Sequence, residues 1–124
     1  MLYLPLALYS WSAFGREAEY VVALYLRSSG WNVVLSKGSR GPADIVATCR
    51  SAQWFIQVKS SAGIPRLRGY EIKRLKEIAA CMGGLPVIST LQPFDRGFST
   101  GNYSIIFYLL DSWQTLDPVN TLKS

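Results

Sequence analysis

The sequence predicts an α/β domain in which helices flank a mixed five-stranded sheet. Two segments have helical apolar spacing and end at glycine, and five short runs are apolar or alternate in polarity. Their order is helix, three strands, helix, two strands, and chains of this kind usually bury a sheet between helical layers. At 124 residues, with 49% hydrophobic and 17% charged residues, the chain is suited to one ordered domain.

The first helix is predicted over residues 16–29. Val22, Ala23 and Leu26 follow Glu19 at three, four and seven positions, and Gly30 can end the helix. Glu19 therefore stands on or beside the buried stripe, where a carboxylate needs a partner. This position marks Glu19 as a candidate functional residue.

Five strands are predicted, at residues 31–35, 44–47, 54–58, 86–90 and 104–110. The polar pair Arg50-Ser51 between the second and third strands is typical of a hairpin. A second helix is predicted over residues 68–82, before Gly83, with an apolar stripe of Ile72, Leu75, Ala79 and Met82.

The whole chain, residues 1–124, is expected to form a single domain. Its parts are an apolar N-terminal segment (1–14), a core (15–110) and a tail (111–124). Residues 1–14 lack the basic start of a signal peptide and are too short to span a bilayer. We expect them to pack on the domain or on a second subunit, and no membrane association is expected; a membrane anchor is the alternative.

The composition excludes several kinds of chemistry. There is no histidine, which rules out Ser-His-Asp catalysis, Cys-His catalysis and histidine-ligated zinc. Cys49 and Cys81 are far apart and lack metal-ligand spacing. They are expected to be buried thiols of a cytoplasmic protein in a reducing compartment.

Polar side chains gather on the predicted hairpin. Gln57 and Lys59 are two residues apart on a strand and therefore face the same side, whereas Ile56 and Val58 face the other. If the strands pair, Asp44 at the start of the preceding strand lies alongside them. A carboxylate, an amide oxygen and an ammonium group on one patch can hold a hard cation and orient a water molecule.

This pattern resembles the signature of the PD-(D/E)XK nuclease superfamily. Asp44 is followed by twelve residues and then Gln57-Val58-Lys59, written here PAD…QVK. The stretch Gly15-Arg16-Glu17-Ala18-Glu19 resembles the opening helix of these enzymes, and the eleven-residue spacing to Gly30 selects Glu19. In pattern the chain is similar to the archaeal-type Holliday junction resolvases, with a Gln-x-Lys variant as in Mrr-type endonucleases, over about residues 15 to 90.

The resemblance implies a restriction-endonuclease-like core and metal-dependent hydrolysis of DNA phosphodiester bonds. The implied catalytic residues are Glu19, Asp44, Gln57 and Lys59, and the implied ligands of Mg²⁺ are Asp44, Gln57, the Val58 carbonyl and Glu19. Mn²⁺ is a possible substitute, and no small-molecule cofactor is expected. Because Gln57 brings no charge, metal affinity should be weaker or depend more on the two acids.

The positive charge is concentrated around the suspected site. Residues 35–76 contain nine basic and two acidic residues, whereas the rest of the chain contains four basic and six acidic ones. Such clustering favours a polyanionic partner, here branched or duplex DNA. The expected contacts to the DNA backbone are Lys37, Ser39, Arg40, Arg66, Arg68 and Lys73.

A Holliday junction resolvase makes two symmetric cuts, so a homodimer is expected. The apolar N-terminus and residues 105–108 are candidates for its surface. Two alternatives stay open: a restriction- or homing-type endonuclease that cuts duplex DNA, and a catalytically degenerate nucleic-acid-binding protein. Gln57 favours the second alternative, and the Gln57→Glu variant would distinguish it.

Overall fold

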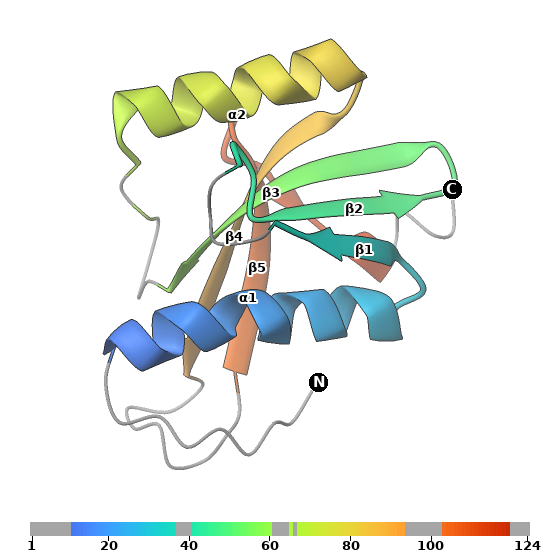
Figure 1. The fold of residues 1–124 in the computed structure, drawn as a ribbon. Helices are drawn as coiled ribbons and strands as arrows, with labels where there is room; N and C mark the ends of the chain where they lie inside the picture. Colours follow the sequence, from blue (N-terminus) through green and yellow to red (C-terminus); the bar gives the residue numbers. More distant parts are fainter. Residues whose placement is uncertain (1–10, 37–40, 61–64, 66, 94–102, 120–124) are drawn as a thin grey trace.

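The computed structural model of this chain describes residues 11–36, 41–60, 65, 67–93 and 103–119. Two helices cover opposite faces of one six-stranded sheet (Figure 1). The elements are α1 (Trp11–Ser28), β1 (Asn32–Leu35), β2 (Ile45–Cys49), β3 (Ala52–Ser60), α2 (Gly69–Met82), β4 (Leu85–Pro93), β5 (Tyr103–Leu109) and β6 (Thr115–Leu116).

The strands lie in the sheet in chain order, β1 to β6. Neighbours are antiparallel except β3 and β4, which run parallel and are connected through α2. The predicted order of helices and strands is confirmed. The sixth strand was not predicted, because β6 has two residues and is too short to show an alternating pattern.

Helix α1 begins at Trp11, earlier than the predicted start at residue 16. Its buried stripe includes Ala18, Val22 and Leu26, each no more than 1% exposed, and it packs on a sheet face centred on Trp54. The helix ends at Ser28, just before Gly30, the predicted stop, where φ is 97° and a side chain would be strained. Glu19 is thus held one position from a fully packed stripe.

Helix α2 packs on the other face through Leu75 and Ala79, which lie with Phe55 and Ile88 of the sheet. Met82, predicted to belong to this stripe, is 56% exposed. It is the last residue of α2, and Gly83 follows in the left-handed conformation, so Met82 projects past the packed part of the helix. None of the helices among the described residues is long and apolar enough to cross a membrane.

The two strands of the hairpin differ in length, and this difference positions the site. Strand β2 has five residues and β3 has nine, and the pairing begins at Ile45 with Ile56 and closes at Cys49 with Ala52. Among the described residues, Gln57 to Ser60 pair with β4 on one side and have no β2 partner on the other. The last four residues of β3 therefore present an open edge.

Phe107 of β5 is 2% exposed and fills the α1-side core against Trp54, whereas Ile105, Ile106 and Tyr108 are partly exposed, so the use of residues 105–108 as a dimer surface stays a prediction. The expectation that both cysteines are buried was wrong. Cys81 is exposed on α2, whereas Cys49 is buried as expected; both cysteines are free.

Candidate active site

A cavity of about 320 Å³ opens at the uncovered edge of β3. Glu19 of α1 lines it from one layer, and the first turns of α2 line it from the other. Between them lie the segment before β2, which includes Asp44, and the β3 residues Gln57 and Val58. The shortness of β2 thus lets both helical layers reach one cavity.

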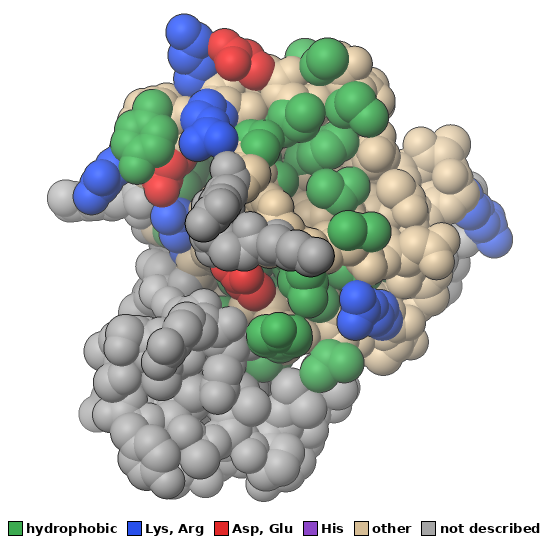
Figure 2. Space-filling view, in the orientation of Figure 1, with side chains coloured by type: hydrophobic (Ala, Val, Ile, Leu, Met, Phe, Trp, Pro, Cys, Tyr) green, Lys and Arg blue, Asp and Glu red, His purple; other side chains and the backbone are tan. Residues whose placement is uncertain are grey.

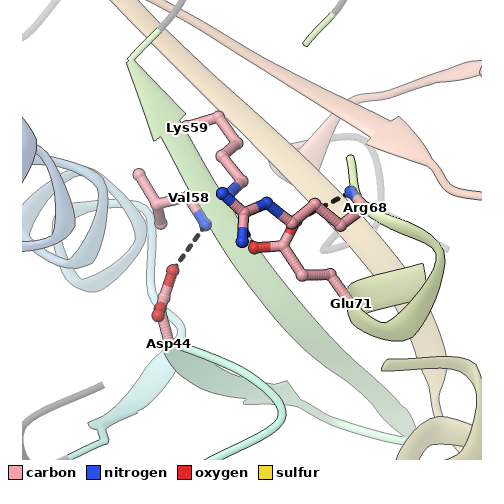
Figure 3. Close-up of polar contacts among 5 residues, drawn as sticks. All are labelled: Asp44, Val58, Lys59, Arg68 and Glu71. Carbon is pink, nitrogen blue, oxygen red and sulfur yellow. Dashed lines mark hydrogen bonds and ion pairs between the residues drawn. The ribbon is translucent and has the colours of Figure 1, made fainter. Parts of the chain in front are cut away.

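Asp44 is held at this edge by its backbone and its side chain. Its N–H donates to the Ile56 carbonyl at 2.9 Å, and its carbonyl accepts from the Ser36 N–H at 2.9 Å. Its Oδ2 atom accepts the Val58 N–H at 2.9 Å (Figure 3). The carboxylate therefore occupies the place where a longer β2 would have supplied a backbone carbonyl.

Asp44 as a whole residue is 5% exposed, and burial raises the pKa of its carboxyl group above the ordinary value of 3.8. The Val58 N–H, the positive charge of Lys59 and a hydrogen bond with Glu19 act in the opposite direction, while the charge of Glu71 adds to the rise. An ionised Asp44 is therefore a buried anion without full compensation from the described side chains, an environment that favours a cation.

Glu19 approaches Asp44 from the α1 layer. Its side chain is half-buried, and its carboxyl is hydrogen-bonded to Asp44. Two carboxyl groups from separate elements that meet in one cavity are better accommodated when a cation lies between them. The structure thus brings Glu19 and Asp44 together, as the sequence pattern required.

Gln57 and Val58 complete the β3 side of the cavity. Val58 packs its side chain on the α1-side core, whereas Gln57 alternates with it and faces the α2 layer. The N–H and C=O groups of one strand residue point to the same side, so the Val58 carbonyl shares the open edge with its N–H. The amide oxygen of Gln57 and the Val58 carbonyl are both neutral oxygen donors.

Lys59 takes a position that the sequence did not predict. Among the described residues, Glu71 lines the cavity and Lys59 does not. The ammonium group of Lys59 lies 3.2 Å from Glu71 Oε1. Glu71 Oε2 also accepts the Arg68 N–H at 3.0 Å (Figure 3). Burial alone would raise the pKa of Glu71, but the Arg68 N–H and Lys59 together hold that pKa below its ordinary value.

Three cavity residues from α2 escaped the sequence analysis: Tyr70, Glu71 and Arg74. Glu71 had one recognisable signal, since it lies three residues after Arg68, the residue before the helix, where an acid can cap the helix start. That signal predicts the cap and not the contact with Lys59.

The predicted DNA contacts fall into two groups. Arg68 and Lys73 are exposed near the start of α2, and Lys73 Nζ lies 4.0 Å from Glu77. Figure 2 shows Lys and Arg side chains gathered over the beginning of α2 with acidic side chains among them. The other predicted contacts lie outside the described residues: Lys37, Ser39, Arg40 and Arg66.

The donors around the cavity fit a hard cation. No three Cys, Asp or Glu side chains among the described residues gather as a metal site. The carboxyl groups of Glu19 and Asp44, the Gln57 amide oxygen and the Val58 carbonyl are nevertheless oxygen donors. Mg²⁺ commonly takes one or two carboxylates and retains several water molecules. A softer metal would require sulfur or imidazole ligands, which this cavity does not offer.

A hairpin of unequal strands, whose uncovered edge receives acids from the hairpin and from a helix, is the arrangement that the resemblance to the PD-(D/E)XK nucleases implied. Comparison with protein families narrows this class. The chain belongs to the archaeal Holliday junction resolvase (Hjc) family, whose sequence model matches residues 11–97. The predicted resemblance, and the predicted function of a nuclease that resolves Holliday junctions, are confirmed at the level of the family.

A solved structure supports the fold. The 1.6 Å structure of Hjc from Archaeoglobus fulgidus, a Holliday junction resolvase from an archaeal hyperthermophile, matches with a TM-score of 0.61 at 22% identity. The match covers 74% of this chain and 72% of that chain. The predicted restriction-endonuclease-like fold is therefore confirmed, with six strands rather than five. No curated protein matches significantly.

Proposed function

We propose that the chain is a Mg²⁺-dependent endodeoxyribonuclease that cuts branched DNA, acting as a homodimeric Holliday junction resolvase. One observation carries the proposal: Asp44, a residue 5% exposed, is hydrogen-bonded to Glu19 from a different layer at a cavity that Gln57 also lines. Family membership supports DNA as the substrate. The free cysteines agree with a reducing, intracellular setting.

Asp44, Glu19, Gln57 and the Val58 carbonyl would hold the metal ion, with Mn²⁺ as a possible substitute. Magnesium bound there would supply positive charge to the scissile phosphate. Asp44 is the principal ligand in this proposal because its position is fixed by three hydrogen bonds. Gln57 contributes an oxygen without charge, so the acids carry most of the electrostatic attraction.

Lys59 would act on the reacting groups from the α2 side of β3. Its ammonium group can donate to the attacking water or to the phosphate oxygens as negative charge develops there. Arg68 and Lys73, together with Lys37, Ser39, Arg40 and Arg66, would contact the DNA backbone. Because a junction is cut symmetrically, two copies of the site related by a two-fold axis are required.

The test uses a labelled four-way junction, a linear duplex and a single strand, each with Mg²⁺ or Mn²⁺. We expect paired symmetric nicks in the junction only. Asp44→Ala should lower the cleavage rate by at least about 10²-fold, the order expected when one preorganised electrostatic group is removed. Junction binding should stay close to that of the wild-type protein, and sedimentation should report a dimer.

Asp111→Asn is the matched control. Asp111 is an exposed acid that pairs with Lys76 at 2.6 Å outside the described cavity lining, so its loss should leave cleavage unchanged. Unimpaired cleavage by Asp44→Ala would refute the assignment. Sequence-specific cutting of the linear duplex would instead support a restriction- or homing-type endonuclease, and activity only after Gln57→Glu would identify a catalytically degenerate nucleic-acid-binding protein.

A further inference from the structure

Lys59 is held from an element that the nuclease signature does not include. Its Nζ atom lies 3.2 Å from Glu71 Oε1 in the first turn of α2, and the two side chains are 28% and 23% exposed. Gln57, two residues away on the same face of β3, is neutral and cannot offer Lys59 an ionic partner. The charge that orients this lysine therefore comes from the helix.

We propose that Glu71 is a positioning residue that holds Lys59 at the rim of the cavity beside Asp44, compensating for the amide at residue 57. The inference rests on the proposed nuclease function. Glu71 lines the cavity, and both Glu71 and Lys59 are close enough to Asp44 to act on it electrostatically. Lys59 therefore lies between two carboxylates, one on each side of β3 (Figure 3).

The two oxygens of Glu71 have separate partners. Oε2 accepts the Arg68 N–H at 3.0 Å and caps the start of α2, whereas Oε1 accepts from Lys59. The cap fixes the Glu71 carboxylate relative to the helix. Because Oε1 of the same carboxylate accepts from Lys59, the position of the lysine ammonium group on β3 is restricted as well. A capping acid without a catalytic consequence would need only the first of these bonds.

The environment of the pair distinguishes it from a surface ion pair. Lys73–Glu77 has side chains 77% and 64% exposed, and Lys76–Asp111 has side chains 47% and 62% exposed. Exposed pairs of that kind contribute little because solvent screens them. The Lys59–Glu71 pair is less exposed on both sides, so it is better able to offset the rotamer entropy that an ordered lysine loses.

The consequence for cleavage follows from geometry. A lysine has four rotatable side-chain bonds, and without an anchor its ammonium group samples positions away from the cavity. Misplacement of a reacting group by about 1 Å can lower a rate by up to about 10²-fold. Glu71→Gln retains an oxygen for the Arg68 N–H but loses the charge. We expect the kcat for junction cleavage to fall about 10-fold to 100-fold with KM unchanged.

The decisive experiment is a rescue. Gln57→Glu places a carboxylate on the same face of β3 as Lys59 and can replace Glu71 as its ionic partner. Cleavage is measured with saturating Mg²⁺ in the wild-type protein, Glu71→Gln, Gln57→Glu and the double variant. We expect Glu71→Gln to lower the kcat for junction cleavage at least about 10-fold when it is introduced into the wild-type protein. When it is introduced into the Gln57→Glu variant, we expect kcat to fall less than about 3-fold.

Three controls make the result specific. Asp111→Asn removes another ion pair of α2 and should leave kcat unchanged. Thermal unfolding of each variant tests whether the cap is retained. Glu71→Asp keeps the charge but shortens the reach, so its kcat should lie between those of the wild-type protein and Glu71→Gln.

The proposal is overturned if Glu71→Gln and Glu71→Asp both cleave at the wild-type rate. It is also overturned if Glu71→Gln lowers kcat by the same factor in the wild-type protein and in the Gln57→Glu variant. Additive losses of that kind would mean that Glu71 serves the helix and not Lys59. If the wild-type protein itself does not cleave the junction, the proposed function fails instead. The two failures are therefore distinguishable.

Discussion

Asp44→Asn should abolish cleavage and at the same time stabilise the metal-free protein. Asp44 is a buried residue, 5% exposed, and burial raises the pKa of its carboxyl group above 3.8 in the folded state. The folded protein therefore binds this proton more tightly than the unfolded chain does. The contribution of Asp44 to stability is greatest below pH 3.8, falls as the pH rises towards the folded-state pKa of Asp44, and stays reduced above it.

The size of the effect can be worked from the contacts. Each unit by which burial raises the pKa of Asp44 corresponds to about 1.4 kcal/mol lost at neutral pH, and asparagine removes this loss because it has no charge. Its amide oxygen can still accept the Val58 N–H, now bonded at 2.9 Å. Alanine removes the charge and the acceptor, and an unpaired buried N–H costs roughly 1 to 3 kcal/mol.

Thermal unfolding in EDTA, followed by circular dichroism from pH 4 to pH 8, measures these differences. For a chain of 124 residues, 1 kcal/mol shifts Tm by about 4 °C. At pH 7.5 we expect the Tm of Asp44→Asn to be higher than that of the wild-type protein, and this difference in Tm should vanish near pH 4. The Tm of Asp44→Ala should be lower than that of Asp44→Asn. A Tm of Asp44→Asn equal to or lower than that of the wild-type protein at pH 7.5 would refute the reasoning.

Two further predictions concern the metal and the backbone. Gln57→Glu should lower the Mg²⁺ concentration for half-maximal cleavage roughly tenfold, or about 1.4 kcal/mol, because it adds charge to the ligand set; an unchanged Mg²⁺ titration would contradict a ligand role for residue 57. Gly84→Ala should destabilise by about 1 to 3 kcal/mol in chemical denaturation, because a Cβ there would lie 2.7 Å from the Gln53 carbonyl. Gly83→Ala has free space for the added Cβ, but φ at this residue is 74°, so the variant should lose about 1 kcal/mol of unfolding free energy. Equal losses in Gly83→Ala and Gly84→Ala would contradict the steric argument.

The sequence predicted those parts of the site that depend on local periodicity. Gln57 and Lys59 share a face because they are two apart on a strand, and the hairpin turn at Arg50-Ser51 brings Asp44 beside that strand. Glu19 was recognisable because helical spacing placed a carboxylate beside an apolar stripe. In each case, the pattern that identified the residue extends over a single element or one tight turn.

The contact between Lys59 and Glu71 could not be predicted in this way. It joins β3 to α2 across the loop between them, and its existence depends on where α2 begins and how the helix lies over the sheet. Helix boundaries are the least reliable part of a prediction from sequence. The contact depends on the packing of Leu75 and Ala79 on the sheet, which fixes the position of the helix.

The difference in length between β2 and β3 explains why these groups form one site. If β2 continued past Ile45, its backbone would pair with Val58 and close the edge to both helices. Because it stops there, the Val58 N–H needs an acceptor, and the Asp44 side chain supplies it at 2.9 Å. The same hydrogen bond therefore completes the sheet and holds a carboxylate in a buried position that raises its pKa. A carboxylate that also closes a strand edge cannot move freely, and such rigidity suits the metal site that we propose.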